Sequence, residues 1–295
     1  MATKLFDRLT DVRGMPLAGQ SSPVRINVPT IGRLLNIKGN VTKAGVPATL
    51  AEMKLAIGEV RFILNTEVVR KLMFAEYLAM LEANGFINED GLFPYYFAEP
   101  WRAQVADEEL LSLALGGRYA NAALDFDLAQ PAVALDFDMA HEYDLQTKVM
   151  PPGTPQAGQP ILGILGHTVQ VENLGAGVPR IVINPFEGAL QRMWVVVPAT
   201  VNVNRVRIIQ GQTAFYDRWN TIGKPEIERS LKDSGMVMPA NFTTAQGTFK
   251  MVPIILDNNQ RISNNITNTA GLVVELTLDT PAPTTRLIIE QAINR

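Results

Sequence analysis

The run Val206-Arg207-Ile208-Ile209 decides the fold, because the first half of the chain contains a matching run, Val60-Arg61-Phe62-Ile63. Both runs are rich in the β-branched and apolar residues that favour strands. Each is followed by a segment with near-helical apolar spacing, Thr66–Asn84 after the first and Thr213–Ser234 after the second. We therefore predict a strand followed by a helix in both places and compare the two halves as copies of one unit.

Further pairs of segments agree in order and spacing. Gly85 ends the first helix-like segment and Gly235 ends the second, each in the position of a helix C-cap. Ordered agreement at several places indicates internal duplication. The remaining pairs are Arg25-Ile26 with Arg180-Ile181, and Leu124–Leu128 with Val274–Leu278.

The chain has 295 residues, of which 47% are hydrophobic and 19% are charged. That length suits two domains, and the composition is that of a globular protein that can bury a sizeable core. The chain contains no cysteine, which excludes disulfides, thiolate metal sites and cysteine nucleophiles. The fold must therefore be held by packing alone.

Short runs of alternating apolar and polar residues, separated by glycine, proline and asparagine, dominate both halves. This pattern is typical of antiparallel sandwiches. It predicts an all-β fold with helical insertions, organised as two tandem eight-stranded jelly rolls. The proline-rich stretch 150–159 indicates a linker. The predicted parts are an N-terminal segment (1–22), a first jelly roll (23–149), this linker and a second jelly roll (160–295).

The formal net charge of -3 argues against direct nucleic-acid binding, which needs clustered lysine and arginine. No apolar run approaches the roughly 20 residues that cross a bilayer, and the first residues lack the apolar region of a secretory signal. We therefore expect synthesis to end in the cytoplasm.

The order of these segments resembles that of the double jelly-roll major capsid proteins, and most of all the type found in corticoviruses and related bacteriophages with an internal membrane. The resemblance covers most of the chain and is a pattern of order and spacing without a catalytic signature. It rests on Val206–Gln210, the insertion up to Gly235, Phe249–Leu256 and Leu272–Leu278, and in the first half on Tyr96–Trp101 and Ala122–Leu128.

The resemblance implies a structural protein rather than an enzyme. Three copies would form a pseudo-hexameric homotrimer, and such trimers would tile an icosahedral virion shell around an internal membrane. The implied partners are the chain itself, neighbouring capsomers, penton and minor capsid proteins, and the viral lipid membrane, near which the N-terminal segment would lie. The implied location is the virion capsid, after synthesis in the cytoplasm of a host bacterium.

The N-terminal segment carries three basic residues, Lys4, Arg8 and Arg13, among apolar ones such as Phe6. One hypothesis is a short amphipathic helix that touches anionic lipid or a neighbouring subunit. The alternative is a frayed or locally packed terminus.

The sequence ALDFD occurs twice, at Ala123–Asp127 and at Ala134–Asp138. If the two copies formed paired strands, alternation would gather four carboxylates on one surface, where like charges repel. Calcium takes several carboxylate oxygens and is a candidate to offset that repulsion. A hydrated acidic face, or one met by lysine and arginine of another subunit, is the alternative. The four candidate ligands are Asp125, Asp127, Asp136 and Asp138.

No catalytic site is predicted, and no cofactor beyond calcium. His141 and His167 are too few for a three-histidine zinc site, so we expect them at surface or interface positions. Trp101, Trp194 and Trp219 are expected to pack in cores, with stacking on sugars as the alternative. Two other functions stay open: a carbohydrate-binding or glycan-processing double sandwich, and a minor capsid or spike subunit.

Overall fold

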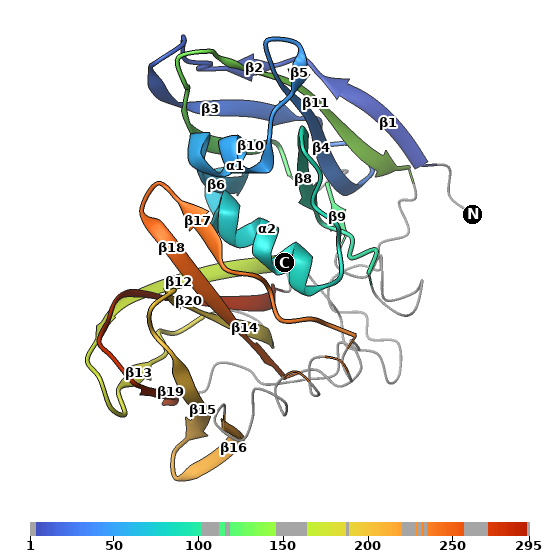
Figure 1. The fold of residues 1–295 in the computed structure, drawn as a ribbon. Coiled ribbons are helices and arrows are strands. Elements are labelled where there is room, and N and C mark those ends of the chain that lie inside the picture. The colour runs from blue at the N-terminus through green and yellow to red at the C-terminus, as the bar shows by residue number, and fades with distance from the viewer. Residues whose placement is uncertain are drawn as a thin grey trace. The chain divides into compact units, whose positions relative to one another are not determined.

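The computed structural model describes residues 4–101, 112–115, 119–145, 164–186, 189–219, 228, 232, 235–256 and 271–293. In these residues antiparallel strands dominate, with helices α1 (Leu50–Ala56) and α2 (Phe74–Ala83) between them (Figure 1). The predicted linker, 150–159, lies outside the described residues. The chain divides into two compact units, one of Met1–Leu78, Ile87–Gly166 and Asn294–Arg295, the other of Ala79–Phe86 and His167–Ile293.

The first unit contains two antiparallel sheets. Sheet A has the order β1-β11-β4-β5, with β8 and β9 also paired to β4, and sheet B has the order β2-β3-β10-β6-β7. The strands of sheet A are β1 (Lys4–Leu9), β4 (Arg33–Lys43), β5 (Val46–Pro47), β8 (Leu92–Tyr96), β9 (Leu113–Ala114) and β11 (Leu135–Asp144). Those of sheet B are β2 (Val12–Arg13), β3 (Ser21–Val28), β6 (Ile57–Leu64), β7 (Glu67–Met73) and β10 (Ala122–Ala129).

The second unit also contains two sheets. Sheet C has the order β12-β20-β14-β18-β17, and sheet D has the order β13-β19-β15-β16. The strands of sheet C are β12 (Ile164–Leu174), β14 (Ala189–Pro198), β17 (Phe242–Thr244), β18 (Gly247–Ile255) and β20 (Ala282–Ile293). Those of sheet D are β13 (Arg180–Val182), β15 (Val203–Gln210), β16 (Thr213–Trp219) and β19 (Leu272–Leu278).

The two units share one topology. The orders β1-β11-β4-β8 and β3-β10-β6-β7 in the first unit match β12-β20-β14-β18 and β13-β19-β15-β16 in the second, strand for strand in chain order. Eight strands in two sheets with this connectivity form a jelly roll. The predictions of two tandem jelly rolls, helical insertions and internal duplication are therefore confirmed.

The pairing register of the central strands matches as well. Asn36 of β4 stands opposite Glu142 of β11, and Arg192 of β14 stands opposite Glu290 of β20. Beside each of these pairs the register shifts by one residue, which is skipped. An extra residue of this kind is a β-bulge. The skipped residues are Leu35 and Gln191.

The next strand of each sheet repeats a proline at the matching position. Pro94 of β8 stands opposite Lys38, and Pro253 of β18 stands opposite Trp194. The segments LFPYY (92–96) and MVPII (251–255) are therefore counterparts, a correspondence that the sequence comparison did not find.

The core of the first unit is aromatic. Phe62 of β6 lies 4.6 Å from Phe97 between ring centroids, and Phe126 of β10 lies 5.7 Å from Phe93 of β8. These contacts join sheet B to sheet A. Burying each such side chain contributes about 1.5–3 kcal/mol.

The core of the second unit is aliphatic. Its side chains come from both sheets, C and D, and are almost fully buried. Representative members are Met193, Ile208, Val252, Val274 and Ile289.

Helix α2 begins later than the sequence predicts. Glu67–Met73, the first part of the predicted helix, is strand β7, because it pairs with β6. The helix prediction is confirmed from Phe74 to Ala83. Gly85 ends it with φ of +84°, and its N–H donates to the Glu82 carbonyl at 2.9 Å.

The second predicted helix is wrong in the same way at its start. Thr213–Trp219 is strand β16, paired with β15, and most of the segment from there to Ser234 lies outside the described residues. Gly235 repeats the closing turn, with φ of +74° and its N–H donating to the Lys232 carbonyl at 3.0 Å.

The N-terminal residues form strands rather than an amphipathic helix, so that hypothesis is wrong. β1 pairs with β11 along its whole length, and β2 pairs with β3. Alternation along β1 buries Leu9 and leaves Phe6 62% exposed. The first jelly roll therefore includes Lys4–Leu9, which the sequence had assigned to a separate segment.

Candidate functional site

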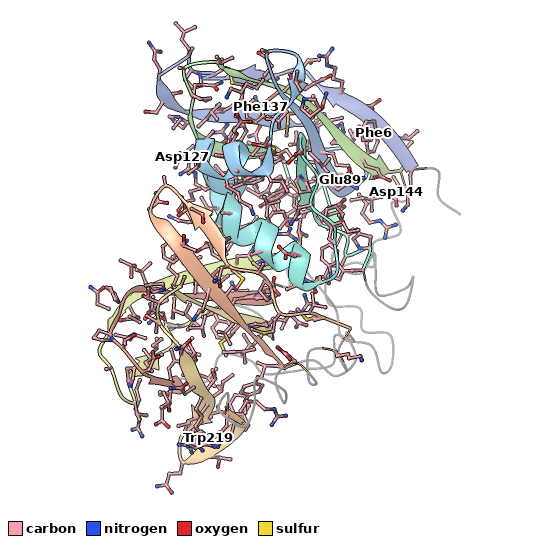
Figure 2. The ribbon with its side chains drawn as sticks, in the orientation of Figure 1. Phe6, Glu89, Asp127, Phe137, Asp144 and Trp219 are labelled. Atoms are coloured by element: carbon pink, nitrogen blue, oxygen red, sulfur yellow. The ribbon has the colours of Figure 1, made fainter. Side chains whose placement is uncertain are left out.

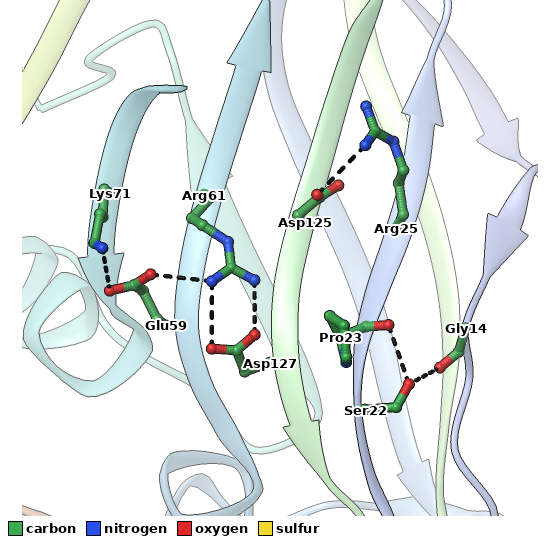
Figure 3. A network of polar contacts seen from close by, with 9 residues as sticks. All are labelled: Gly14, Ser22, Pro23, Arg25, Glu59, Arg61, Lys71, Asp125 and Asp127. Carbon is green, nitrogen blue, oxygen red and sulfur yellow. Dashed lines mark hydrogen bonds and ion pairs between the residues drawn. The ribbon is translucent and has the colours of Figure 1, made fainter. Parts of the chain in front are cut away.

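Sheet B carries a ladder of ion pairs on the face turned away from its core (Figure 3). Asp125 of β10 lies between buried neighbours in sequence, so its side chain points to the opposite face. It stands opposite Arg25 of β3 and Arg61 of β6. The Arg25 guanidinium lies 3.7 Å from the Asp125 carboxylate, whereas Arg61 bonds Asp127 at 2.6 Å. The ladder continues to β7 through Glu59, whose carboxylate lies 3.1 Å from Arg61 and 3.1 Å from Lys71.

Sheet D carries a similar ladder. Glu275 of β19 stands opposite Arg180 of β13 and Arg207 of β15. Its two carboxylate oxygens accept hydrogen bonds from these guanidinium groups, at 2.9 Å from Arg180 and 2.8 Å from Arg207. The ladder continues to β16, where Asp217 lies 2.6 Å from Arg205.

Trp219 ends this ladder at the edge of sheet D. It is 42% exposed, and the Arg205 guanidinium carbon lies 4.1 Å from its ring centroid, a cation–π contact. The expectation of core packing is confirmed for Trp194, which is fully buried, and is wrong for Trp219. An exposed aromatic ring stacked on arginine is typical of protein interfaces.

The two ladders repeat one triplet. An acidic residue in the second-to-last strand of each unit is flanked by two arginines, one on each neighbouring strand. The sequence comparison had placed these residues in matching segments, but it did not predict that they are neighbours. The sequence did contain a signal for this arrangement. In two of the matched pairs of segments, both members carry an arginine directly beside the matching apolar residue. The triplets are Arg25, Asp125 and Arg61, and Arg180, Glu275 and Arg207.

The expected cluster of four carboxylates does not form. Asp125 and Asp127 lie on β10 in sheet B, whereas Asp136 and Asp138 lie on β11 in sheet A. The two ALDFD strands cannot pair because the turn at Gln130 carries the chain from one sheet to the other. The Gln130 side-chain amide accepts a hydrogen bond from the Leu135 N–H and donates one to the Leu135 carbonyl. The premise of the calcium prediction is therefore wrong.

The carboxylates instead meet arginine. Asp127 bonds Arg61, and Asp138 bonds Arg8 of β1 at 2.6 Å. Within the described part of the chain, no three acidic or histidine side chains gather in a way that suits a metal ion.

The three basic residues of the N-terminal segment do not form one basic face. Lys4 and Arg8 lie on β1, and Arg13 lies on β2, in the other sheet. Arg8 is paired with Asp138, and Arg13 is paired with Asp11 at 2.9 Å. Among the described residues, no helix is both long enough and apolar enough to span a membrane.

The histidines are buried rather than at the surface, so that expectation is wrong. His141 of β11 contacts the Asp7 carbonyl at 3.2 Å, and burial lowers its pKa. His167 of β12 lies 3.3 Å from the Glu290 carboxylate, and Arg192 lies 3.7 Å from it. Burial alone would raise the pKa of Glu290, but the His167 hydrogen bond and the Arg192 charge outweigh it, so the pKa is lowered.

A hollow of about 650 Å³ lies on the outer face of sheet A. Its floor is formed by β1, β4, β8 and β11, with Lys38 and Ala140 among the lining residues. Phe6 and Glu89, both labelled in Figure 2, lie at this hollow. The lining combines charges of both signs with an exposed aromatic ring, which suits a protein surface better than a small metabolite.

Searches against protein-family models and curated proteins give no match. Among solved structures, the major capsid protein P2 from Bacteriophage PM2 is similar with a TM-score of 0.73 and 14% identity, over 98% of this chain and 96% of that one. The capsid of PBCV-1 virus gives a TM-score of 0.57 at 12% identity, over 99% and 94%. The STIV major capsid protein gives 0.55 at 11% identity, over 98% and 96%. The chain therefore has the double jelly-roll fold of viral major capsid proteins.

Proposed function

We propose that the chain is the major capsid protein of an icosahedral virus, in which pseudo-hexameric homotrimers tile a shell around an internal membrane. The observation that carries the proposal is the repeat within the chain: two jelly rolls with the same strand order, the same bulge and the same triplet of charged residues. Three such chains offer six similar domains, so a trimer fills a hexagonal position with one gene product.

The similarity to capsid proteins supports the same proposal, since it spans nearly the full length of both chains. In this role the partners are other copies of the chain, neighbouring trimers, and penton and minor capsid proteins. The location is the virion, after synthesis in the host cytoplasm. The net charge of -3 suits a shell whose inner side faces lipid rather than nucleic acid. A structural role of this kind requires no catalysis.

Light scattering over a dilution series tests the proposal. We expect a stable species at three times the chain mass of 32.4 kDa, and particles of hexagonal outline by electron microscopy. A strict monomer at every concentration would contradict the proposal and favour a glycan-binding sandwich. A trimer without hexagonal outline would favour a minor capsid or spike subunit.

A further inference from the structure

The strand pairs β6–β7 and β15–β16 match position by position. Among the described strands, β7 pairs only with β6 and β16 only with β15, so β7 and β16 are edges of their sheets. Each edge strand has one extra residue at the same point of the register, Val69 in β7 and Phe215 in β16. The register therefore gives each residue of β7 a counterpart in β16.

The charge at one pair of counterparts is reversed. Lys71 of β7 stands opposite Arg61 (Figure 3), and Asp217 of β16 stands opposite Arg207, which matches Arg61 in sequence. The first jelly roll thus has a cation where the second has an anion. The Lys71 side chain is 52% exposed and the Asp217 side chain 36%, so both charges are accessible to a partner.

The neighbouring position shows a second reversal. Glu59 of β6 stands opposite Met73, and its counterpart Arg205 of β15 stands opposite Trp219. Here the first jelly roll has the anion and the second has the cation. Met73 is partly exposed and Trp219 is 42% exposed, and a thioether packs favourably against an aromatic ring. All three pairs of counterparts are therefore complementary to each other.

We propose that the β6–β7 edge of one chain binds the β15–β16 edge of a second copy in a neighbouring trimer, across an approximate two-fold axis. This inference rests on the proposed function. A two-fold axis between two similar domains brings each residue near the axis to its own counterpart. Lys71 then meets Asp217 of the second copy, and Trp219 of the second copy meets Met73. Domains within one ring are related head to tail instead, so the contact lies between rings.

The reversed charges also disfavour the wrong pairings. Two first jelly rolls in this contact would set Lys71 against Lys71, and two second jelly rolls would set Asp217 against Asp217. Like charges brought together across an interface oppose binding. Arg61 and Arg207 keep the same charge in both copies, but each lies in ion pairs of its own sheet. The edge therefore selects contact between a first and a second jelly roll.

Charge-reversal variants test the contact. Lys71→Glu or Asp217→Lys alone sets like charges against each other, and we expect either to raise the concentration at which trimers associate about tenfold or more. A chain with both changes should associate like the parent, because the two charges still attract. If the charges acted only within their own sheets, the double variant would be the weakest, since both ion pairs are lost. A double variant without recovered association would overturn the inference.

Lys43→Glu is the matched control. The Lys43 amine lies 2.6 Å from the Glu52 carboxylate in the first jelly roll, so this change also breaks one ion pair, but away from the β6–β7 edge. We expect its trimers to associate like the parent, as measured by light scattering against concentration. An effect as large as that of Lys71→Glu would overturn the inference, as would parent trimers that never associate. Circular dichroism of every variant checks that it is folded.

Cross-linking tests which edges meet, and the absence of cysteine leaves no competing thiol. Lys71→Cys and Asp217→Cys chains with different tags are purified separately as trimers, mixed, and treated with a short bis-maleimide. We expect a band of two chains that carries both tags, and none from either variant alone. Intact trimers that give no mixed band would overturn the inference and leave the proposed function standing. A protein that forms no trimer at all would overturn the proposed function instead.

Discussion

Asp125 in β10 and Glu275 in β19 occupy matching positions in the two jelly rolls, yet the pKa of Asp125 is raised and that of Glu275 is lowered. Burial dominates at Asp125, because Arg61 bonds Asp127 and leaves only the longer contact with Arg25. At Glu275 the hydrogen bond from Arg207 dominates, and Arg180 adds a second. The ladder of sheet D thus holds its central carboxylate, Glu275, more firmly than the ladder of sheet B holds Asp125.

Neutralising these two carboxylates should have different effects on the free energy of unfolding at pH 7. A lowered folded-state pKa means that ionised Glu275 stabilises the fold above its ordinary pKa of 4.5, and that this stabilisation is lost as the pH falls through the folded value. Glu275→Gln should therefore lower the free energy of unfolding at pH 7, by about 1.5–3 kcal/mol, the contribution of a hydrogen bond to a charged group. The loss should shrink on acidification. Urea unfolding at several pH values measures it.

Asp125→Asn is the matched comparison. A raised pKa means that the fold favours the protonated carboxyl, so ionisation of Asp125 weakens the fold as the pH rises through the folded-state pKa. The amide removes that penalty, and we expect unchanged or slightly higher stability at pH 7. A loss as large as that of Glu275→Gln would show that Arg25 holds Asp125 as firmly as Arg207 holds Glu275.

Gly32→Ala should destabilise the first jelly roll strongly. Gly32 has φ of +58°, and an added Cβ would overlap the backbone carbonyl oxygen of Asp144. Gly45 also has positive φ, +80°, but an added Cβ meets nothing there. Gly45→Ala should therefore cost about 1 kcal/mol from backbone strain alone, and Gly32→Ala about 3 kcal/mol or more. The denaturant midpoints of the two variants separate the cost of backbone strain from the cost of the overlap with the Asp144 carbonyl. If both variants lost the same stability, the close approach of Gly32 to Asp144 would be contradicted.

Ala44→Asn should stabilise the protein. Ala44 and Gly45 join β4 to β5 with φ of +52° and +80°, the backbone of a type I′ hairpin turn. Asparagine tolerates this conformation better than alanine, and Asn-Gly is the favoured pair. We expect a gain of about 0.5–1 kcal/mol, seen as a higher melting temperature. Ala44→Val is the opposite control, since a β-branched residue resists positive φ. If valine were tolerated as well as asparagine, the turn would not have this backbone.

Removal of metal should leave the protein unchanged. The four aspartates once expected to share calcium lie on two different sheets, and two of them, Asp127 and Asp138, bond arginine. We expect the same melting temperature and the same mass in solution with a calcium chelator as without it. A fall in either quantity, reversed by added calcium, would show a site formed between subunits.

The repeat was predictable from sequence because its strands carry matching polar and apolar residues in the same order. Val60–Ile63 and Val206–Ile209 do lie in β6 and β15, and Leu124–Leu128 and Val274–Leu278 lie in β10 and β19. Alternation within each run fixes the face that each side chain takes, and this is local information.

Two strands were wrongly predicted to be helical because the spacing of their apolar residues suits a helix as well as a strand. In Glu67–Met73 the apolar residues fall at positions that also suit a helix, and pairing with β6 decides for a strand. The same holds for Lys4–Leu9, which pairs with β11. The ALDFD copies show a further limit, because identical runs lie in different sheets, and no local pattern states which sheet a strand joins.

Because of the bulges at Leu35 and Gln191, the residues before and after the extra residue in β4 and β14 all face the side of the sheet that the fold requires. Side chains alternate along a strand, so one extra residue reverses the face of everything before it. Leu34 and Leu35 are consecutive and both buried, which strict alternation forbids. If Leu35 were paired in the ladder like its neighbours, with no bulge, Leu34 would turn outward and Arg33, now paired with Asp144, would turn toward the core. The length of β4, counted in single residues, is therefore as much a part of the fold's specification as its hydrophobicity, and the same count is kept in β14.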